Sequence, residues 1–328
     1  MTVKAKMQTR NLSLSVAGAS ASVVRPKQES VGKALELTRE QIAAFDEQGF
    51  LSLQALTTPD EVAEIKQLLE QMFAKRAGEK EGAFLDLVAS GKAAPMSSPQ
   101  IFNPNNYCPR LHKTQCFHNA YRVAKQLLGE EVRFFFDLSI LKQPKIGAGT
   151  PWHQDEAYRD ANFEYRELSI WVPLQDVTTE SGCLQYVPGS NNRGLLQHKS
   201  ANDDPTSHAV CVAEPFDESS AVLVPLPAGG CVMHLPRTIH GSTTNVSAAP
   251  RLAYIMAFGL PPKPLKEKRV FSWAAEKQTA AAARNREWMR RGGAFVMLWR
   301  KLRRGELWSW ELASYNAKRL LQKVGVRR

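Results

Sequence analysis

Hydrophobic positions in the first part of the chain are spaced as in amphipathic helices. Residues 38–41 have the sequence Thr-Arg-Glu-Gln, which has the form of a capping box and predicts a short helix ended by Gly49. Residues 50–53 alternate as a strand does. Residues 58–61, Thr-Pro-Asp-Glu, predict a second helix with proline at its first position. A third helix is predicted over residues 119–128.

From residue 132 onward the pattern changes to short runs of β-branched and aromatic residues. Turn sequences such as Pro-Gly-Ser at 188–190 and Ala-Gly-Gly at 228–230 separate these runs. Strands at this spacing are typical of a sandwich or barrel rather than of parallel β-α-β units. We therefore predict a mainly β fold with flanking helices, in which N-terminal helices precede a jelly-roll core. The predicted strands are 132–141, 168–174, 183–187, 221–224, 230–235 and 251–258.

The pattern divides the chain into three parts. Residues 1–36 are expected to be a disordered leader, 37–262 a single domain, and 263–328 a basic helical extension that begins near Pro-Pro-Lys-Pro at 261–264. The first 28 residues weakly resemble a signal or transit peptide, but serines dilute their apolar part. With 43% hydrophobic and 23% charged residues, the composition is that of a soluble globular protein.

Charge is unevenly distributed along the chain, whose net charge is +11. Residues 29–262 carry 20 basic and 27 acidic side chains, whereas 263–328 carry 18 and 5. A mildly acidic centre argues against a nucleic-acid groove in the domain. The aromatic and basic extension could lie on an anionic membrane, but packing of its aromatic side chains on the domain is the favoured interpretation.

Cysteine usage gives no sign of a disulfide framework. The five cysteines are an odd number, and no two of them form a C-x-x-C pair that would suggest a zinc site. We therefore expect a cytoplasmic protein, with peripheral membrane contact through the extension as the alternative. Oligomeric state does not follow from the sequence.

Candidate chemistry is concentrated in residues 149–155, Gly-Thr-Pro-Trp-His-Gln-Asp. On an extended strand, residues two apart face the same side, so His153 and Asp155 can offer a nitrogen and an oxygen to one metal ion. By itself this pattern is weak, because it arises by chance in about a third of chains of this composition. A facial triad needs a third ligand from a distant strand and leaves three coordination positions open. His240, 87 residues after His153, is the candidate.

Arg251 stands at the head of an alternating strand, 11 residues after His240. If the two strands form a hairpin, both residues lie near the same end of one sheet. A buried guanidinium there would bind a carboxylate in bidentate fashion, and Ser242 could add a hydroxyl. Two alternatives are a His240 hydrogen-bonded in the core and an Arg251 paired with a structural acid. Other candidate third ligands lack the following Gly-Ser and the downstream arginine: His198, His208 and His234.

Taken together, these motifs resemble the phytanoyl-CoA dioxygenase family of iron and 2-oxoglutarate oxygenases, over about residues 37–261. The resemblance implies a double-stranded β-helix (jelly roll, cupin-like), with Fe(II) held by His153, Asp155 and His240. It also implies that Arg251 binds 2-oxoglutarate with help from Ser242, Trp171 and Lys142. The segments that carry it are His153-Gln154-Asp155, Trp171, Ser181-Gly182-Cys183-Leu184, Val187-Pro188-Gly189-Ser190, His240-Gly241-Ser242 and Arg251.

The implied activity is hydroxylation of an organic small molecule with O2, through an iron-oxo intermediate, with release of succinate and CO2. Related halogenases carry a small residue in place of the carboxylate, so Asp155 favours hydroxylation. The alternatives are a non-catalytic metal-binding jelly roll and a membrane-surface module. The substrate and its oxidised position do not follow from the sequence; the loops expected to select the substrate are 84–107, 158–166 and 193–214.

For several residues near these motifs, two interpretations remain open. Trp171 lies in an apolar strand, where it is either a core residue or a wall of the cosubstrate site. Tyr158 and Arg159 either touch substrate or form a polar loop. Gly182, together with the later Pro-Gly turn, is expected to be a turn residue without a chemical role.

Overall fold

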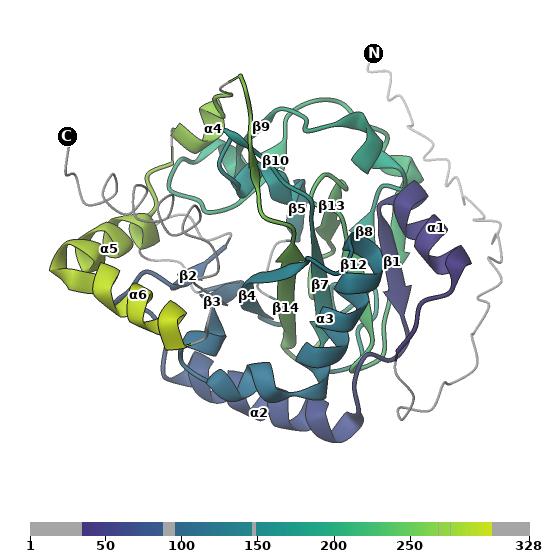
Figure 1. Ribbon diagram of the computed structural model, residues 1–328, viewed down its shortest axis with the longest axis horizontal. Helices are drawn as coiled ribbons and strands as arrows, with labels where there is room; N and C mark the ends of the chain where they lie inside the picture. Colours follow the sequence, from purple (N-terminus) through teal and green to yellow (C-terminus); the bar gives the residue numbers. More distant parts are fainter. Residues whose placement is uncertain (1–34, 88–95, 146–148, 268, 276, 304–328) are drawn as a thin grey trace, which may run out of the picture.

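Two antiparallel sheets make up the core of the computed structural model, which describes residues 35–87, 96–145, 149–267, 269–275 and 277–303. The larger sheet has the strand order β1-β12-β7-β14-β4-β3-β2, and the smaller sheet has the order β11-β8-β13-β5 (Figure 1). Two short ribbons, β10-β9 and β15-β6, complete the β structure of the described residues. This arrangement agrees with the predicted jelly-roll core.

The strands are short outside the centre of the larger sheet. That sheet consists of β1 (Phe50–Leu53), β2 (Phe84–Asp86), β3 (Pro99–Phe102), β4 (Arg133–Lys142), β7 (Glu167–Pro173), β12 (Cys231–His234) and β14 (Arg251–Gly259). The smaller sheet consists of β5 (Thr150–His153), β8 (Leu184–Tyr186), β11 (Val222–Val224) and β13 (His240–Ser242). The ribbons are β6 (Phe163–Glu164), β9 (His198–Ser200), β10 (Val210–Val212) and β15 (Lys263–Pro264).

Helices precede the sheets, as predicted. Helix α1 (Arg39–Gln48) has both halves of its capping box and ends at Gly49, which is left-handed with φ of 83°. Helix α2 (Pro59–Ala74) is capped by the Thr58 side chain. Helix α3 (Gln115–Leu128) begins four residues before the predicted start, because the Thr114 side chain accepts the backbone N–H of Phe117 and forms an N-cap.

Strand β14 is buried on both faces, and its alternate residues join two different cores. Leu252, Tyr254, Met256 and Phe258 pack in a cluster that includes the apolar faces of α2 and α3. Their neighbours along β14 point the other way, into a second cluster between the two sheets. Arg251 shares this inner alternation, so its side chain starts in the interior between the sheets.

The strands of His240 and Arg251 do not form the hairpin that was considered for them. Strand β13 pairs with β5 and β8 in the smaller sheet, whereas β14 pairs with β4 and β7 in the larger one. The connecting residues 243–250 pass from one sheet to the other, and buried Asn245 holds this crossing by donating to the carbonyl groups of Lys142 (3.3 Å) and Ala249 (2.9 Å).

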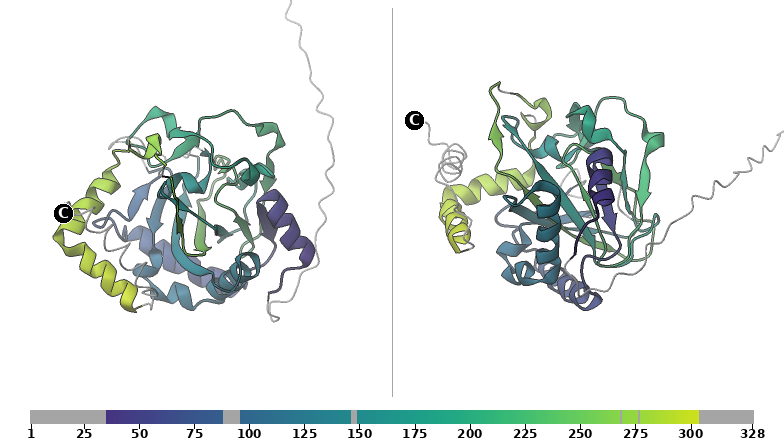
Figure 2. Two further views of the ribbon diagram at one scale, coloured as in Figure 1. Left: turned by 45° about the horizontal axis from the view of Figure 1, so that its top comes forward. Right: turned by 45° about the vertical axis from the view of Figure 1, so that its right-hand side comes forward.

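The described part of the C-terminal extension packs against the domain. Helices α4 (Ser272–Ala275), α5 (Ala280–Trp288) and α6 (Ala294–Arg303) follow β15, and α5 and α6 lie beside the β2 and β3 edge of the larger sheet (Figures 1 and 2). Asn285 donates to the carbonyl of Glu81 (3.0 Å), and Arg300 forms an ion pair with the same residue (2.8 Å).

This packing agrees with the favoured interpretation for residues 263–303. Phe295 remains 78% exposed on α6, and contact of this helix with a membrane stays a prediction. Nowhere in the described residues is there a helix with the length and hydropathy to cross a bilayer. The expected leader lies almost entirely outside the described residues, and the boundaries at 36 and 262 stay predictions. All five cysteines are free thiols.

Candidate metal centre and cosubstrate site

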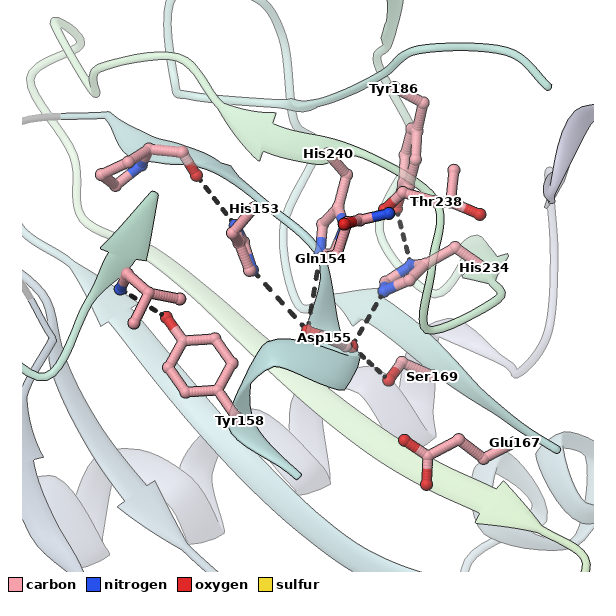
Figure 3. A network of polar contacts seen from close by, with 12 residues as sticks. His153, Gln154, Asp155, Tyr158, Glu167, Ser169, Tyr186, His234, Thr238 and His240 are labelled. Carbon is pink, nitrogen blue, oxygen red and sulfur yellow. Dashed lines mark hydrogen bonds and ion pairs between the residues drawn. The ribbon is translucent and has the colours of Figure 1, made fainter. Parts of the chain in front are cut away.

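Three side chains from two strands and a turn meet between the sheets. The pairing of β13 with β5 sets His240 directly opposite His153. The sequence pattern predicts Asp155 on the same strand as His153, and this is wrong. Strand β5 ends at His153, and Asp155 opens a 3-10 turn, η3 (Asp155–Tyr158). The turn brings the carboxylate back toward both rings (Figure 3). Asp155 Oδ1 lies 3.6 Å from His153 Nε2 and 3.8 Å from His240 Nε2.

Both histidines are oriented by hydrogen bonds on their other ring nitrogen. His153 Nδ1 lies 2.8 Å from the carbonyl oxygen of Pro151, and His240 Nδ1 lies 2.9 Å from that of Thr238. A carbonyl only accepts, so each Nδ1 carries the proton and each Nε2 keeps a lone pair. Burial, helped by the neighbouring histidines, lowers the pKa of His240 well below its ordinary value, which keeps the ring neutral.

The second oxygen of Asp155 is held by two donors. Oδ2 accepts hydrogen bonds from Ser169 Oγ (2.8 Å) and His234 Nε2 (3.2 Å), and His234 Nδ1 lies 3.0 Å from the Tyr186 hydroxyl (Figure 3). Burial acts to raise the pKa of Asp155, but the contacts with His153, His234 and His240 outweigh it and hold that pKa well below the usual value. The carboxylate is therefore ionised, with Oδ1 left for a metal ion.

These contacts distinguish the histidines that lie in the cluster of possible metal ligands from those that lie outside it. Ligand atoms of His153, Asp155 and His240 all lie within 4.8 Å of one another, and no second group of this kind occurs in the described residues. His234 orients Asp155 instead of joining the cluster. His198 uses Nε2 to accept the backbone N–H of Gln154 (3.1 Å), and His208 also lies outside the cluster.

Gln154, between two of the ligands, fixes the surrounding loops. Its amide nitrogen donates to the carbonyl groups of Gly194 (2.8 Å) and Arg237 (2.6 Å), and its amide oxygen accepts from the backbone N–H of Leu196 (2.8 Å). The roles of Gln154, His234, Ser169 and Tyr186 were missed from the sequence. The one available signal was a polar residue inside an otherwise apolar run, as at Ser169.

Two buried cations lie on the inner face of the larger sheet. Lys142 and Arg251 are cross-strand partners of β4 and β14, exposed by 0% and 2%. Burial and the charge of Arg251 lower the pKa of Lys142 to about 6, and burial lowers that of Arg251 to about 10. Among the described residues, no acid forms an ion pair with either cation, so a structural acid partner for Arg251 is not found.

Some of the hydrogen-bond donors around these two side chains have acceptors, and others have none. Lys142 Nζ contacts Ser242 Oγ (2.6 Å), and Arg251 Nη1 donates to the carbonyl of Gly182 (2.5 Å), so Gly182 does more than form a turn. The Arg251 guanidinium lies 5.2 Å from the centre of the Trp171 ring. Arg251 Nε and Trp171 Nε1 are buried without partners among the described residues. Positive charge with unused donors fits a bound carboxylate.

Ser242 connects this cationic end with the metal cluster. It lies two residues after His240 on β13, so both side chains face the same side of the strand. All seven residues singled out in the sequence, three ligands and four cosubstrate candidates, thus converge on one interior region. The donor set fits both groups implied by the resemblance, a divalent iron and a dicarboxylate.

Comparison with known proteins supports this chemistry. The sequence model of the phytanoyl-CoA dioxygenase family matches residues 45–253, which is more than half of the chain. The chain belongs to the phytanoyl-CoA dioxygenase family. A solved structure of similar fold, EvdO2 from Micromonospora carbonacea var. aurantiaca in complex with 2-oxoglutarate, is 31% identical with a TM-score of 0.63. That match covers 74% of this chain and 98% of EvdO2.

Two curated relatives are similar over different lengths. Phytanoyl-CoA dioxygenase domain-containing protein 1 of Danio rerio is 31% identical over 118 residues, 35% of this chain and 40% of that protein, so the match spans less than half of the relative. L-proline trans-4-hydroxylase of Streptomyces griseoviridis is 25% identical over 232 residues, 65% of this chain and 83% of the enzyme.

Family membership confirms the predicted fold and reaction class. The protein is a 2-oxoglutarate-dependent dioxygenase with a double-stranded β-helix core, and it requires Fe(II), 2-oxoglutarate and O2. One of its relatives, L-proline trans-4-hydroxylase, is named for a small-molecule substrate. The assignments of individual residues and the substrate go further than the family and are proposals.

Proposed function

We propose that this dioxygenase hydroxylates an organic small molecule, with Fe(II) held by His153, Asp155 and His240. The observation that supports this most strongly is the convergence of two histidine nitrogens and one carboxylate oxygen within 4.8 Å. Three such ligands leave three coordination positions open, which a substrate-oxidising iron needs and a structural metal site does not. Together with 2-oxoglutarate, the iron supplies the oxidising power that places one oxygen atom of O2 in a C–H bond, with succinate and CO2 as by-products.

Arg251 and Lys142 would hold the distal carboxylate of 2-oxoglutarate, with Ser242 and Trp171 beside it. Support comes from the missing counter-charge: burial, together with the charge of Arg251, lowers the pKa of Lys142 to about 6. A bound dicarboxylate would supply the missing negative charge and accept from Arg251 Nε and Trp171 Nε1. Ser242 then fixes the distance between this anchor and His240.

The residues around the ligands set where substrate enters. The side chains of His153 and His240 are 10% and 6% exposed, whereas that of Asp155 is 20% exposed. The cluster therefore opens on the side of Asp155, and the protein covers the other sides and excludes water there. Asp155 also occupies the position that a halide would take, which supports hydroxylation.

Succinate formation tests this proposal without knowledge of the substrate. Protein purified without oxygen would receive Fe(II), 2-oxoglutarate and then air, and uncoupled turnover would release succinate. We expect activity in the wild type and its loss in Asp155→Ala and Arg251→Ala, with Arg300→Ala as the control for loss of a partly buried arginine. Activity that persists in Asp155→Ala and Arg251→Ala would contradict the residue assignments.

The non-catalytic alternative has its own signature in the same preparation. A protein that only senses or stores the metal would bind 2-oxoglutarate in the presence of Fe(II) but release no succinate with any substrate tried. The intact ligand set and the uncompensated cations both support the catalytic form.

A further inference from the structure

An ion pair lies next to the turn that carries Asp155. Arg159 directly follows η3, which begins with Asp155, and its Nε lies 2.6 Å from Glu167 Oε1. Glu167 and Ser169 are two residues apart on the same face of β7, about 7 Å along the strand. Because Ser169 contacts Asp155, Glu167 shares the interior with the metal ligands (Figure 3).

Each partner of this ion pair has one unused polar atom. Arg159 Nη2 and Glu167 Oε2 are buried without hydrogen-bond partners among the described residues. Leaving a buried donor and a buried acceptor unsatisfied is costly, and a bound ligand that supplies the missing partner is one explanation for such atoms. The pair therefore presents one N–H donor and one carboxylate acceptor side by side.

In the sequence, Tyr158 directly precedes Arg159 and follows Asp155 by three residues. Tyr158 is 41% exposed, yet its hydroxyl accepts the backbone N–H of Val210 (3.0 Å), and its ring centre lies 5.9 Å from that of His153. Its position is thus fixed while part of the ring stays uncovered. Such a surface binds the C–H face of a ring compound.

The arginines that contact η3 and its neighbours are neutralised by ion pairs. Arg159 is neutralised by Glu167, and Glu156 pairs with Arg237 (2.6 Å) and Arg269 (3.4 Å). Arg159, Arg237 and Arg269 thus each face a carboxylate. The buried cations without an acid partner, Lys142 and Arg251, belong to the cosubstrate end, whereas Lys277 contacts the carbonyl groups of Ser207 and Ala209. An extra carboxylate or phosphate near Arg159 would meet Glu167 and be repelled.

We propose that Arg159 and Glu167 form the polar subsite for substrate and select a hydroxyl group of an uncharged ring compound that packs on Tyr158. A hydroxyl accepts from Arg159 Nη2 and donates to Glu167 Oε2, so it satisfies both atoms at once. Carboxylates, amino acids and acyl thioesters of coenzyme A do not fit this pair. The inference rests on the proposed function of the metal cluster and names its substrate class.

The test measures substrate-stimulated succinate release by the Fe(II)-loaded full chain. Three sets of probes are compared at equal concentration: uncharged hydroxylated ring compounds such as methyl glycosides and inositols, carboxylates including amino acids, and acyl-CoA thioesters. We expect stimulation by members of the first set only. Stimulation mainly by an anion would overturn the proposal. So would no stimulation by the first set in protein that binds 2-oxoglutarate normally.

Variants tie the selection to the ion pair. Glu167→Gln removes the charge of the acceptor and should lower kcat/KM for the best uncharged probe at least about tenfold. If this variant does not fold, the double variant Arg159→Met with Glu167→Leu replaces the pair by apolar side chains of similar volume, a change that buried ion pairs often tolerate. It should lose stimulation by the uncharged probes.

Two controls separate the possible failures. The affinity for 2-oxoglutarate in the presence of Fe(II) reports the proposed metal and cosubstrate site, so its absence in the wild type would refute the proposed function itself. Arg300→Met with Glu81→Leu removes a comparable, partly buried ion pair far from η3 and should leave stimulation unchanged. Unchanged kcat/KM in both Glu167→Gln and the double variant would assign the pair a purely structural role.

Discussion

His234 and Tyr186 form a chain of hydrogen bonds that ends on Asp155 Oδ2. Groups that orient a metal ligand contribute about 10- to 100-fold to metal affinity. We predict that His234→Phe, which keeps an aromatic ring but loses the donor, weakens Fe(II) binding at least about tenfold. An anaerobic titration with Fe(II) measures this, with His118→Ala as the control. Wild-type affinity in His234→Phe would show that Asp155 needs no such support.

Lys142 gives the cosubstrate site a pH dependence. Its pKa of about 6 in the folded chain lies below its ordinary value of 10.5, so unfolding takes up a proton between these values. The free energy of unfolding therefore falls as pH drops from 10.5 to about 6. A bound dianion favours the protonated amine, so 2-oxoglutarate binding takes up a proton above pH 6 and weakens as pH rises.

We predict that Lys142→Met removes the pH dependence of both stability and 2-oxoglutarate binding. The variant should unfold with a higher free energy than the wild type at neutral pH, by about 1 to 2 kcal/mol, and bind 2-oxoglutarate more weakly. Its affinity should also be nearly the same at all pH values above 6, unlike that of the wild type. Calorimetric titrations across this range, with Fe(II) present, measure the difference; a wild-type affinity that does not change with pH would contradict the role of Lys142.

At the scale of elements, the long segments were predictable and the short ones were not. Helices α1 and α2 carry caps that can be recognised in the sequence, and β4, β7 and β14 are long apolar runs. Strands β5 and β13 have four and three residues, too few to show a period, and they carry the two histidine ligands. The pairing of β13 depends on a crossing between sheets, which a local pattern does not encode.

The segment that follows the family match fixes the turn of Asp155. Trp273 in α4 is 4% exposed and donates to the carbonyl of Ala157 in η3 (3.0 Å). We predict that Trp273→Ala lowers the free energy of unfolding by about 3 kcal/mol and weakens Fe(II) binding as well. Phe295→Ala, at an exposed position of the same extension, should change stability by less than about 0.5 kcal/mol. Urea unfolding measures both; equal stability of the two variants would contradict this role of α4.

For the whole molecule, the two sheets explain why residues far apart in sequence form one site. The smaller sheet supplies His153, His240 and Ser242, and the larger sheet supplies Lys142, Trp171 and Arg251. Motifs and the family resemblance were enough to select these residues from the sequence. The strand pairings that bring them together could not be predicted in the same way. The helper residues Ser169, Tyr186 and His234 come from strands of both sheets and became visible only in the fold.

Calorimetric titration of 2-oxoglutarate into the oxygen-free protein, with and without Fe(II), tests most directly whether these residues form one metal and cosubstrate site. We predict one bound 2-oxoglutarate per chain with Fe(II) present and at least about tenfold weaker binding without it. His240→Ala should abolish the effect of the metal, whereas His118→Ala should not. Equal affinity with and without Fe(II), or an undiminished metal effect in His240→Ala, would contradict the assignment of the site.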